Sequence, residues 1–210
     1  VRVAQQRHDH ELLLQDAEHL AHGLDGVEGL GHARRAAHVD VLGVLDGSGA
    51  VVVGQDMRPS SEPLAHAFAE GVMARGADVV RIGLASTDQL YFASGFLGCA
   101  GAMFTASHNP AAYNGIKMAK AGAVPVSSDT GLFDIRDLAQ TYLDEGLPVS
   151  TEAPEGTVSE VDVLADYADY LRSLVDLSGI RPLKVVVDAG NGMGGLTTPA
   201  VLGDAILPGL

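Results

Sequence analysis

From Ala50 onward, short apolar runs alternate with longer stretches in which apolar residues recur every three to four positions. The short runs are typical of buried strands, and the longer stretches are typical of amphipathic helices. This alternation indicates an α/β domain with a largely parallel sheet. The predicted elements are strand 50–54, helix 61–75, strand 78–83, helix 87–96, strand 100–105, strand 115–119 and helix 130–143.

Residues around position 60 support the predicted start of the first helix. Ser60 or Ser61 is expected to cap its amino end, and Pro63 suits its first turn. Gly76 follows the predicted carboxyl end, where glycine commonly stops a helix.

The segment after the third helix changes in composition. Residues 144–158 are rich in Ser, Thr, Pro and Gly, and residues 144–176 hold nine acidic side chains against one basic side chain. Such a stretch is typical of a solvated linker. A helix at 161–174 and a strand at 183–187 then follow. We therefore predict a first domain at 49–143, a linker at 144–159 and the start of a second, truncated domain at 160–210.

The first 48 residues differ from the rest of the chain. They contain six of the eight histidines and no clear strand pattern. Metal binding by this histidine-rich segment is one interpretation. The second interpretation is that the segment is a surface helix or disordered sequence. We favour this second interpretation because no defined metal-ligand spacing repeats.

Composition narrows the classes of function. The net charge is −14, which argues against nucleic acids and anionic membranes as partners. Apolar residues make up 47% of the chain, enough to bury a core. No apolar run approaches the roughly 18 residues of a membrane span, and we predict a soluble, cytoplasmic protein. Cys99 is the single cysteine, so an intrachain disulfide framework is excluded.

The residues with the clearest chemistry follow strand 100–105. A buried strand delivers Ser107 into a loop whose Asn109-Pro110 step disfavours helix. Ligands of open α/β sheets bind at this carboxyl edge of the strands. With His108 beside it and Lys117 ten residues on, Ser107 is a candidate nucleophile or phosphate carrier. The alternative is an ordinary polar turn.

The sequence of this loop resembles that of a known family. Residues 105–110 (TASHNP) followed by 113–117 (YNGIK) are similar to the active-site loop of the α-D-phosphohexomutases, the phosphomannomutase/phosphoglucomutase family. Residues 53–61 (VGQDMRPSS) and 187–195 (VDAGNGMGG) are similar to the family's first strand-to-helix turn and to the start of its second domain. The resemblance covers the chain from Ala50 to its end.

This resemblance implies a fold and an activity. The fold is a three-layer α/β/α domain with a mixed, largely parallel sheet, followed by the start of a second similar domain. The activity is the interconversion of hexose 1-phosphate and hexose 6-phosphate, with mannose or glucose as the sugar. The serine carries a phosphoryl group, and a hexose 1,6-bisphosphate is the intermediate. Residues 113–115 favour the mannose/glucose branch over the glucosamine branch.

The resemblance also implies roles for individual residues. Ser107 is the phosphoryl carrier, and its phosphate oxygen binds Mg²⁺. Lys117 and Arg58 match cationic residues near the transferred group. His108 and Asn109 are expected to contact the sugar phosphate.

The chain also departs from the family pattern. The aspartate-rich Mg²⁺ loop, the sugar-recognition loop and the phosphate-clamping loop have no counterpart before Leu210, which leaves the metal site incomplete. A Tyr-Asp-x-Arg-Gly arm is also missing, and we interpret residues 1–48 as an aberrant start joined near Gly49. We expect the 210-residue chain to be inactive alone.

Three alternatives remain from the sequence. Residues 190–195 fit the G-x-G-x-x-G pattern of a dinucleotide-binding oxidoreductase, although Asp188-Ala189 intervene after the predicted strand. A serine hydrolase is disfavoured because Ser107 lacks the G-x-S-x-G elbow. A non-catalytic truncated α/β domain is the more serious rival.

Overall fold

A six-stranded mixed sheet organises the protein, for which a computed structural model describes residues 49–106, 109–146, 155–176, 179, 181 and 184–206. The strand order is β5-β4-β3-β1-β2-β6. Strands β3, β1, β2 and β6 are parallel, whereas β4 and β5 are antiparallel to their neighbours. The predicted mixed, largely parallel sheet is confirmed. The strands are β1 (Ala50–Gln55), β2 (Asp78–Leu84), β3 (Ala100–Phe104), β4 (Ile116–Lys120), β5 (Val124–Pro125) and β6 (Val158–Glu160).

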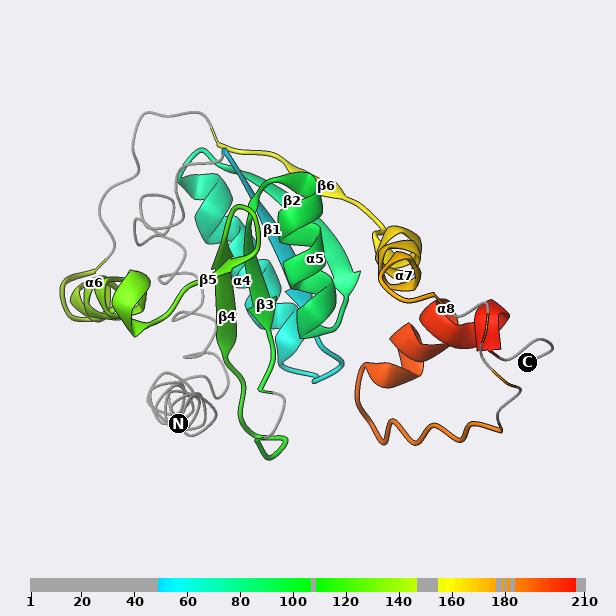
Figure 1. Ribbon diagram of the computed structural model, residues 1–210. Helices are drawn as coiled ribbons and strands as arrows, with labels where there is room; N and C mark the ends of the chain where they lie inside the picture. The colour runs from blue at the N-terminus through cyan, green and yellow to red at the C-terminus, as the bar shows by residue number, and fades with distance from the viewer. Residues whose placement is uncertain are drawn as a thin grey trace.

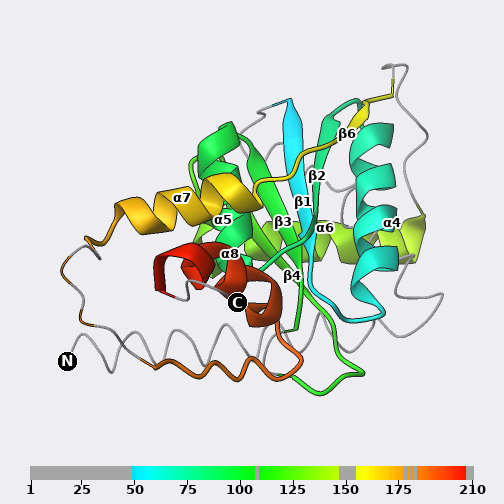
Figure 2. The ribbon, with the colours of Figure 1, turned by 90° about the vertical axis from the view of Figure 1, so that its right-hand side faces the viewer.

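Helices lie on both faces of the sheet (Figures 1 and 2). Helices α4 and α6 pack on one face, and α5 and α7 pack on the other. Among the described residues, no helix combines the length and the apolar character needed to cross a membrane. The helices are α4 (Ser61–Ala74), the 3₁₀ turn η1 (Ser128–Thr130), α6 (Leu132–Glu145), α5 (Thr87–Leu97), α7 (Leu164–Ser173) and α8 (Gly194–Ile206).

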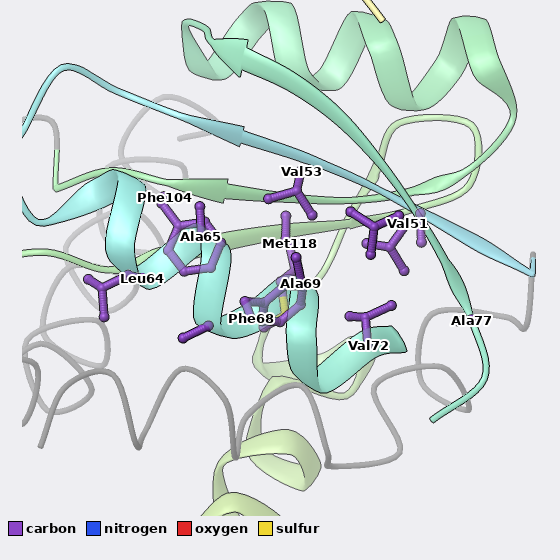
Figure 3. Packing of buried hydrophobic residues seen from close by; sticks show 14 of the residues in the cluster. Val51, Val53, Leu64, Ala65, Phe68, Ala69, Val72, Ala77, Phe104 and Met118 are labelled. Carbon is purple, nitrogen blue, oxygen red and sulfur yellow. The ribbon is translucent and has the colours of Figure 1, made fainter. Parts of the chain in front are cut away.

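The alternation of β1 side chains divides the core into two parts. Val51 and Val53 face α4, where Phe68 is fully buried and meets Phe104 of β3 edge to face at 5.5 Å (Figure 3). Val52 points to the opposite face, toward α5. Because successive strand side chains point to opposite faces, one short apolar strand anchors both helical layers.

The predicted cap of the first helix is correct in position but not in mechanism. Ser60 is the N-cap residue of α4, yet its side chain makes no capping hydrogen bond. Its hydroxyl instead accepts a hydrogen bond from Asn114 at 2.8 Å. By contrast, Ser86 caps α5 conventionally, accepting from the Gln89 amide at 3.2 Å. The serine at position 60 is therefore used for a long-range contact.

Strand β6 and helix α7 differ from the sequence expectation. The predicted linker at 144–159 includes Val158 and Ser159, which belong to β6 and pair with β2. Within helix 161–174, the structure places α7 against α5, where Phe92 contacts the rings of Tyr167 and Tyr170. The chain from β6 to α7 thus packs on the sheet of the first predicted domain.

The carboxylate of Asp78 attaches β6 to the sheet and gives a pH prediction. It accepts hydrogen bonds from the amide and the hydroxyl of Thr157, both at 2.7 Å, and these bonds hold its pKa below the ordinary value. A lowered folded-state pKa contributes stability above the unfolded pKa of about 3.9, and this contribution is lost as the pH falls through the folded value.

We expect Asp78→Asn to lower the free energy of unfolding at neutral pH and to lose this effect at acidic pH. Urea titrations of the wild type and Asp78→Asn between about pH 7 and pH 2.5 measure the difference. Asp166→Asn is the control, because this carboxylate is exposed in the first turn of α7. A difference that stays constant over the pH range would contradict the prediction.

The predicted strand at 183–187 is wrong for the residues described there. Residues 184–189 have no regular secondary structure, and Val186 is 85% exposed. A strand needs a neighbour for its backbone groups, and no described strand pairs with this segment. Helix α8 follows the glycine-rich turn. The predictions for residues 1–48 and for half of the linker, residues 147–154, lie outside the described residues.

Candidate functional site

The carboxyl ends of β1 and β3 lie side by side and form the base of the site. The two strands are parallel neighbours, and the Asp56 amide donates to the Phe104 carbonyl at 3.0 Å. From β3 the chain enters the loop 105–115 and returns as β4 (Figure 1). The loop therefore leaves the sheet at the edge predicted for ligand binding. Ser107 and His108 themselves lie outside the described residues.

A buried carboxylate joins the turn after β1 to this loop. One oxygen of Asp56 accepts from the Ser61 hydroxyl at 2.5 Å and from the Arg58 amide at 3.0 Å. The other oxygen accepts from the Thr105 hydroxyl at 2.8 Å and lies 3.4 Å from Arg58 Nε. These four contacts satisfy a carboxylate that would be costly to bury alone.

The Arg58 guanidinium reaches across the loop. Its two terminal nitrogens donate to four backbone carbonyls that lie on both sides of the undescribed pair 107–108. The acceptors and distances are Ala106 at 3.3 Å, Asn109 at 2.8 Å, Pro110 at 2.9 Å and Tyr113 at 3.2 Å. A single side chain thus contacts the loop backbone at four described positions.

Asn114 fastens the returning end of the same loop. Its amide nitrogen donates to the hydroxyls of Ser60 and Ser61 at 2.8 and 2.9 Å, and its side-chain oxygen accepts from the Gly115 amide. The Thr105 amide also donates to the Gly115 carbonyl at 3.0 Å. Both ends of the loop are therefore tied to each other and to the amino end of α4.

The remaining predicted site residues lie around this loop. Lys117 lies near the start of β4, where its backbone pairs with Met103 of β3, and its exposed side chain makes no hydrogen bond or ion pair with another described residue. Asn109 is partly exposed, and its backbone amide donates to Ala106 at 2.7 Å. Arg58 thus contacts the loop at Ala106 and Asn109, on either side of Ser107 in the chain, and Lys117 follows the loop in β4.

The described residues do not fit a Mg²⁺ site. No group of three or more His, Cys, Asp or Glu side chains within the described ranges is arranged to hold a metal. The carboxylate in the site, Asp56, is already engaged by Ser61, Arg58 and Thr105. Mg²⁺ prefers several free oxygen ligands and bound waters. We therefore derive no step through a metal ion.

Sequence reasoning missed Asp56, Thr105 and Asn114. The available signal was positional, because Asp56 comes just after the predicted strand 50–54 and Thr105 ends the predicted strand 100–105. Polar residues after neighbouring parallel strands meet at one edge of the sheet. Periodicity does not reveal that β1 and β3 are adjacent strands, and so it does not predict the contact between Asp56 and Thr105.

The fold and the site define an α/β/α domain that carries a braced serine loop at the carboxyl edge of its parallel strands. The sequence model of a family described as "Phosphoglucomutase/phosphomannomutase, alpha/beta/alpha domain I" matches residues 32–144. The chain belongs to the phosphoglucomutase/phosphomannomutase family, and the resemblance identified from the loop motif is confirmed. The match begins at residue 32, so the expected onset at Ala50 is too late.

Individual relatives support the same assignment. The chain is 46% identical over 149 residues to a phosphomannomutase of Escherichia coli. The aligned region covers 70% of this chain and 32% of that protein. It is also 46% identical over 150 residues to a protein of Xanthomonas campestris named phosphohexose mutases. That alignment covers 70% of this chain and 32% of the relative. The chain spans about a third of the length of these curated relatives.

A solved structure matches over a longer part of the chain. A phosphoglucomutase/phosphomannomutase family protein from Burkholderia thailandensis superposes with a TM-score of 0.64 at 31% identity. The superposition covers 84% of this chain and 38% of that chain. The α/β fold of the described residues is therefore the fold of this family.

Proposed function

We propose that this chain provides the phosphoryl-carrying part of a phosphohexomutase that interconverts hexose 1-phosphate and hexose 6-phosphate. Ser107 is the carrier, and mannose and glucose phosphates are the substrates. Membership of the family supports the class of reaction. The observation that carries the assignment to this loop is the brace of four hydrogen bonds from Arg58 to the backbone around Ser107.

The proposed chemical step is a phosphoryl transfer from a hexose 1,6-bisphosphate. The Ser107 hydroxyl oxygen attacks phosphorus, the bond between phosphorus and the sugar oxygen breaks, and the serine proton passes to that oxygen. The products are phosphoserine and a hexose monophosphate, and the reverse step phosphorylates the other end of a reoriented sugar. Positioning and positive charge supply most of the catalysis in such transfers.

The other matched residues have proposed roles around this step. Lys117, whose exposed side chain follows the carboxyl end of the loop, stabilises negative charge on the transferred group. His108 and Asn109 contact the sugar phosphate. A well-oriented nucleophile is the main requirement, since effective molarity depends on the placement of the reacting oxygen.

Intact-mass measurement tests the carrier assignment. We expect incubation of the 210-residue chain with glucose 1,6-bisphosphate to add one phosphoryl group, and we expect Ser107→Ala to add none. Ser173→Ala is the matched control, because this exposed hydroxyl lies on α7 and donates to the Tyr170 carbonyl. Phosphorylation of Ser107→Ala to the wild-type extent would refute the assignment.

Two rival functions have distinguishable outcomes. A non-catalytic α/β domain takes up no phosphoryl group in that experiment. A dinucleotide-binding protein needs a strand before its glycine loop, and the described residues 184–189 form none. We further propose that the 210-residue chain does not sustain turnover alone. Continued conversion of mannose 1-phosphate in a coupled assay would contradict that part of the proposal.

A further inference from the structure

We propose that Arg58 is a positioning residue, which fixes the backbone of the serine loop and does not bind the transferred phosphate. This inference rests on the proposed role of Ser107 as the phosphoryl carrier. It replaces the expectation, taken from the family resemblance, that Arg58 acts on the phosphoryl group itself. Three observations carry it: the use of its donors, the distribution of its acceptors and the support that Asp56 gives.

Four of the five N–H donors of Arg58 are hydrogen-bonded within the protein, and the fifth faces a carboxylate. A guanidinium has five N–H groups, two on each terminal nitrogen and one on Nε. The terminal nitrogens serve four loop carbonyls, and Nε faces an Asp56 oxygen at 3.4 Å. The Arg58 side chain is only 15% exposed. Binding of a phosphate would therefore require breaking contacts that are already formed.

The acceptors of Arg58 come before and after the proposed nucleophile along the chain. Ala106 precedes Ser107 directly, whereas Asn109, Pro110 and Tyr113 follow it. Two of these carbonyls also accept hydrogen bonds from backbone amides. The Asn109 amide donates to the Ala106 carbonyl, and the Tyr113 amide donates to the Pro110 carbonyl. Arg58 therefore restrains the described backbone that precedes and follows this serine in the chain. The chemistry gains because a displacement of about 1 Å in a reacting group costs on the order of a hundredfold in rate.

Asp56 holds Arg58 in the orientation that this brace requires. It accepts the Arg58 amide at 3.0 Å and also faces the guanidinium. The same carboxylate is bonded to Ser61 of α4 and to Thr105 at the start of the loop. The brace is therefore built into the rigid junction of β1, β3 and α4 and is not a mobile surface side chain.

Lysine at position 58 separates positioning from charge. Lysine keeps the positive charge but has three donors on one nitrogen, which cannot reproduce a planar fork that serves four carbonyls. If Arg58 acts by attracting phosphate, Arg58→Lys should retain much of the function. If Arg58 positions the loop, Arg58→Lys should resemble the neutral variant Arg58→Gln.

The experiment measures two properties of the full 210-residue chain. Hydrogen exchange reports the amides of Asn109 and Tyr113, and rapid-quench phosphorylation with glucose 1,6-bisphosphate gives the maximal rate and the half-saturating concentration. We expect both variants to exchange at least tenfold faster at these amides and to lower the maximal rate about tenfold to hundredfold. The half-saturating concentration should change less than threefold. Arg136→Lys is the control, because this arginine is exposed on α6 and pairs with Asp137.

Any one of three results overturns the inference. A near wild-type maximal rate for Arg58→Lys, or a rise only in the half-saturating concentration, would show that Arg58 acts on the donor through its charge. Unchanged exchange at Asn109 and Tyr113 would show that it does not brace the loop. Amides of β1 and β2 verify that each variant is folded. If the wild type takes up no phosphoryl group, the proposed function fails, but the exchange measurement still decides whether Arg58 braces the loop.

Discussion

Replacement of Phe68 by alanine is expected to lower the free energy of unfolding by about 3–5 kcal/mol. The Phe68 ring is fully buried between α4 and the sheet and contacts the Phe104 ring edge to face. Its removal leaves a cavity beneath β1 and β3 that the surrounding strands cannot readily fill. Urea denaturation followed by circular dichroism measures the loss.

A matched aromatic residue on the opposite helix provides the control. Phe96 on α5 is 57% exposed and stacks on Phe92. We expect Phe96→Ala to cost about 1 kcal/mol or less, because it removes a partly solvated contact and leaves no internal cavity. Equal losses for the two variants would show that burial against the sheet does not determine the effect.

Replacement of Asp56 by alanine is expected to have the largest effect of any polar substitution in the site. The change leaves the Arg58 guanidinium without its carboxylate and leaves the hydroxyls of Ser61 and Thr105 without their acceptor. Removing one partner of a buried ionic contact typically costs about 3–5 kcal/mol. Denaturant titration measures this loss, and the phosphorylation assay should show a slower rate.

Asp56→Asn separates the charge from the shape of the side chain. It keeps one acceptor oxygen for Ser61 and the Arg58 amide but removes the negative charge near Arg58. We expect it to be destabilised by less than half as much as Asp56→Ala. If the free energy of unfolding of Asp56→Ala lies within about 1 kcal/mol of the wild-type value, the carboxylate does not hold the site together.

The elements that the sequence predicts well are those with continuous apolar patterns. Strands β1, β2 and β3 and helices α4 and α5 all contribute buried side chains, so burial itself imposes their periodicity. The extra strands β5 and β6 were not predicted. They are only two and three residues long and are exposed at the edges of the sheet, so no alternation marks them.

The predicted strand at 183–187 shows the opposite error. Val185, Val186 and Val187 have the composition of a buried strand, but all three are exposed among the described residues. A β-branched run describes a preference for a pleated, packed surface and does not supply the neighbouring strand. Local composition alone therefore overestimates regular structure where the described part of the chain offers no partner strand.

In the site, too, sequence reasoning finds contiguous motifs and misses long-range contacts. The loop motif around Ser107 could be read directly, because its residues are contiguous. The brace could not, since Arg58 and Tyr113 are 55 positions apart and meet only through the pairing of β1 with β3. Asp56 and Asn114 occur singly in turns, where their usual role is local hydrogen bonding.

The packing of β6 and α7 has a practical consequence for handling this protein. A polypeptide that ended with α6 would lose β6 and turn β2 into an outer strand with unpaired N–H and C=O groups. It would also uncover Phe92, whose ring now meets Tyr167 and Tyr170. Because such edges and apolar patches promote self-association, a soluble piece for crystallisation or spectroscopy should extend beyond Ser173.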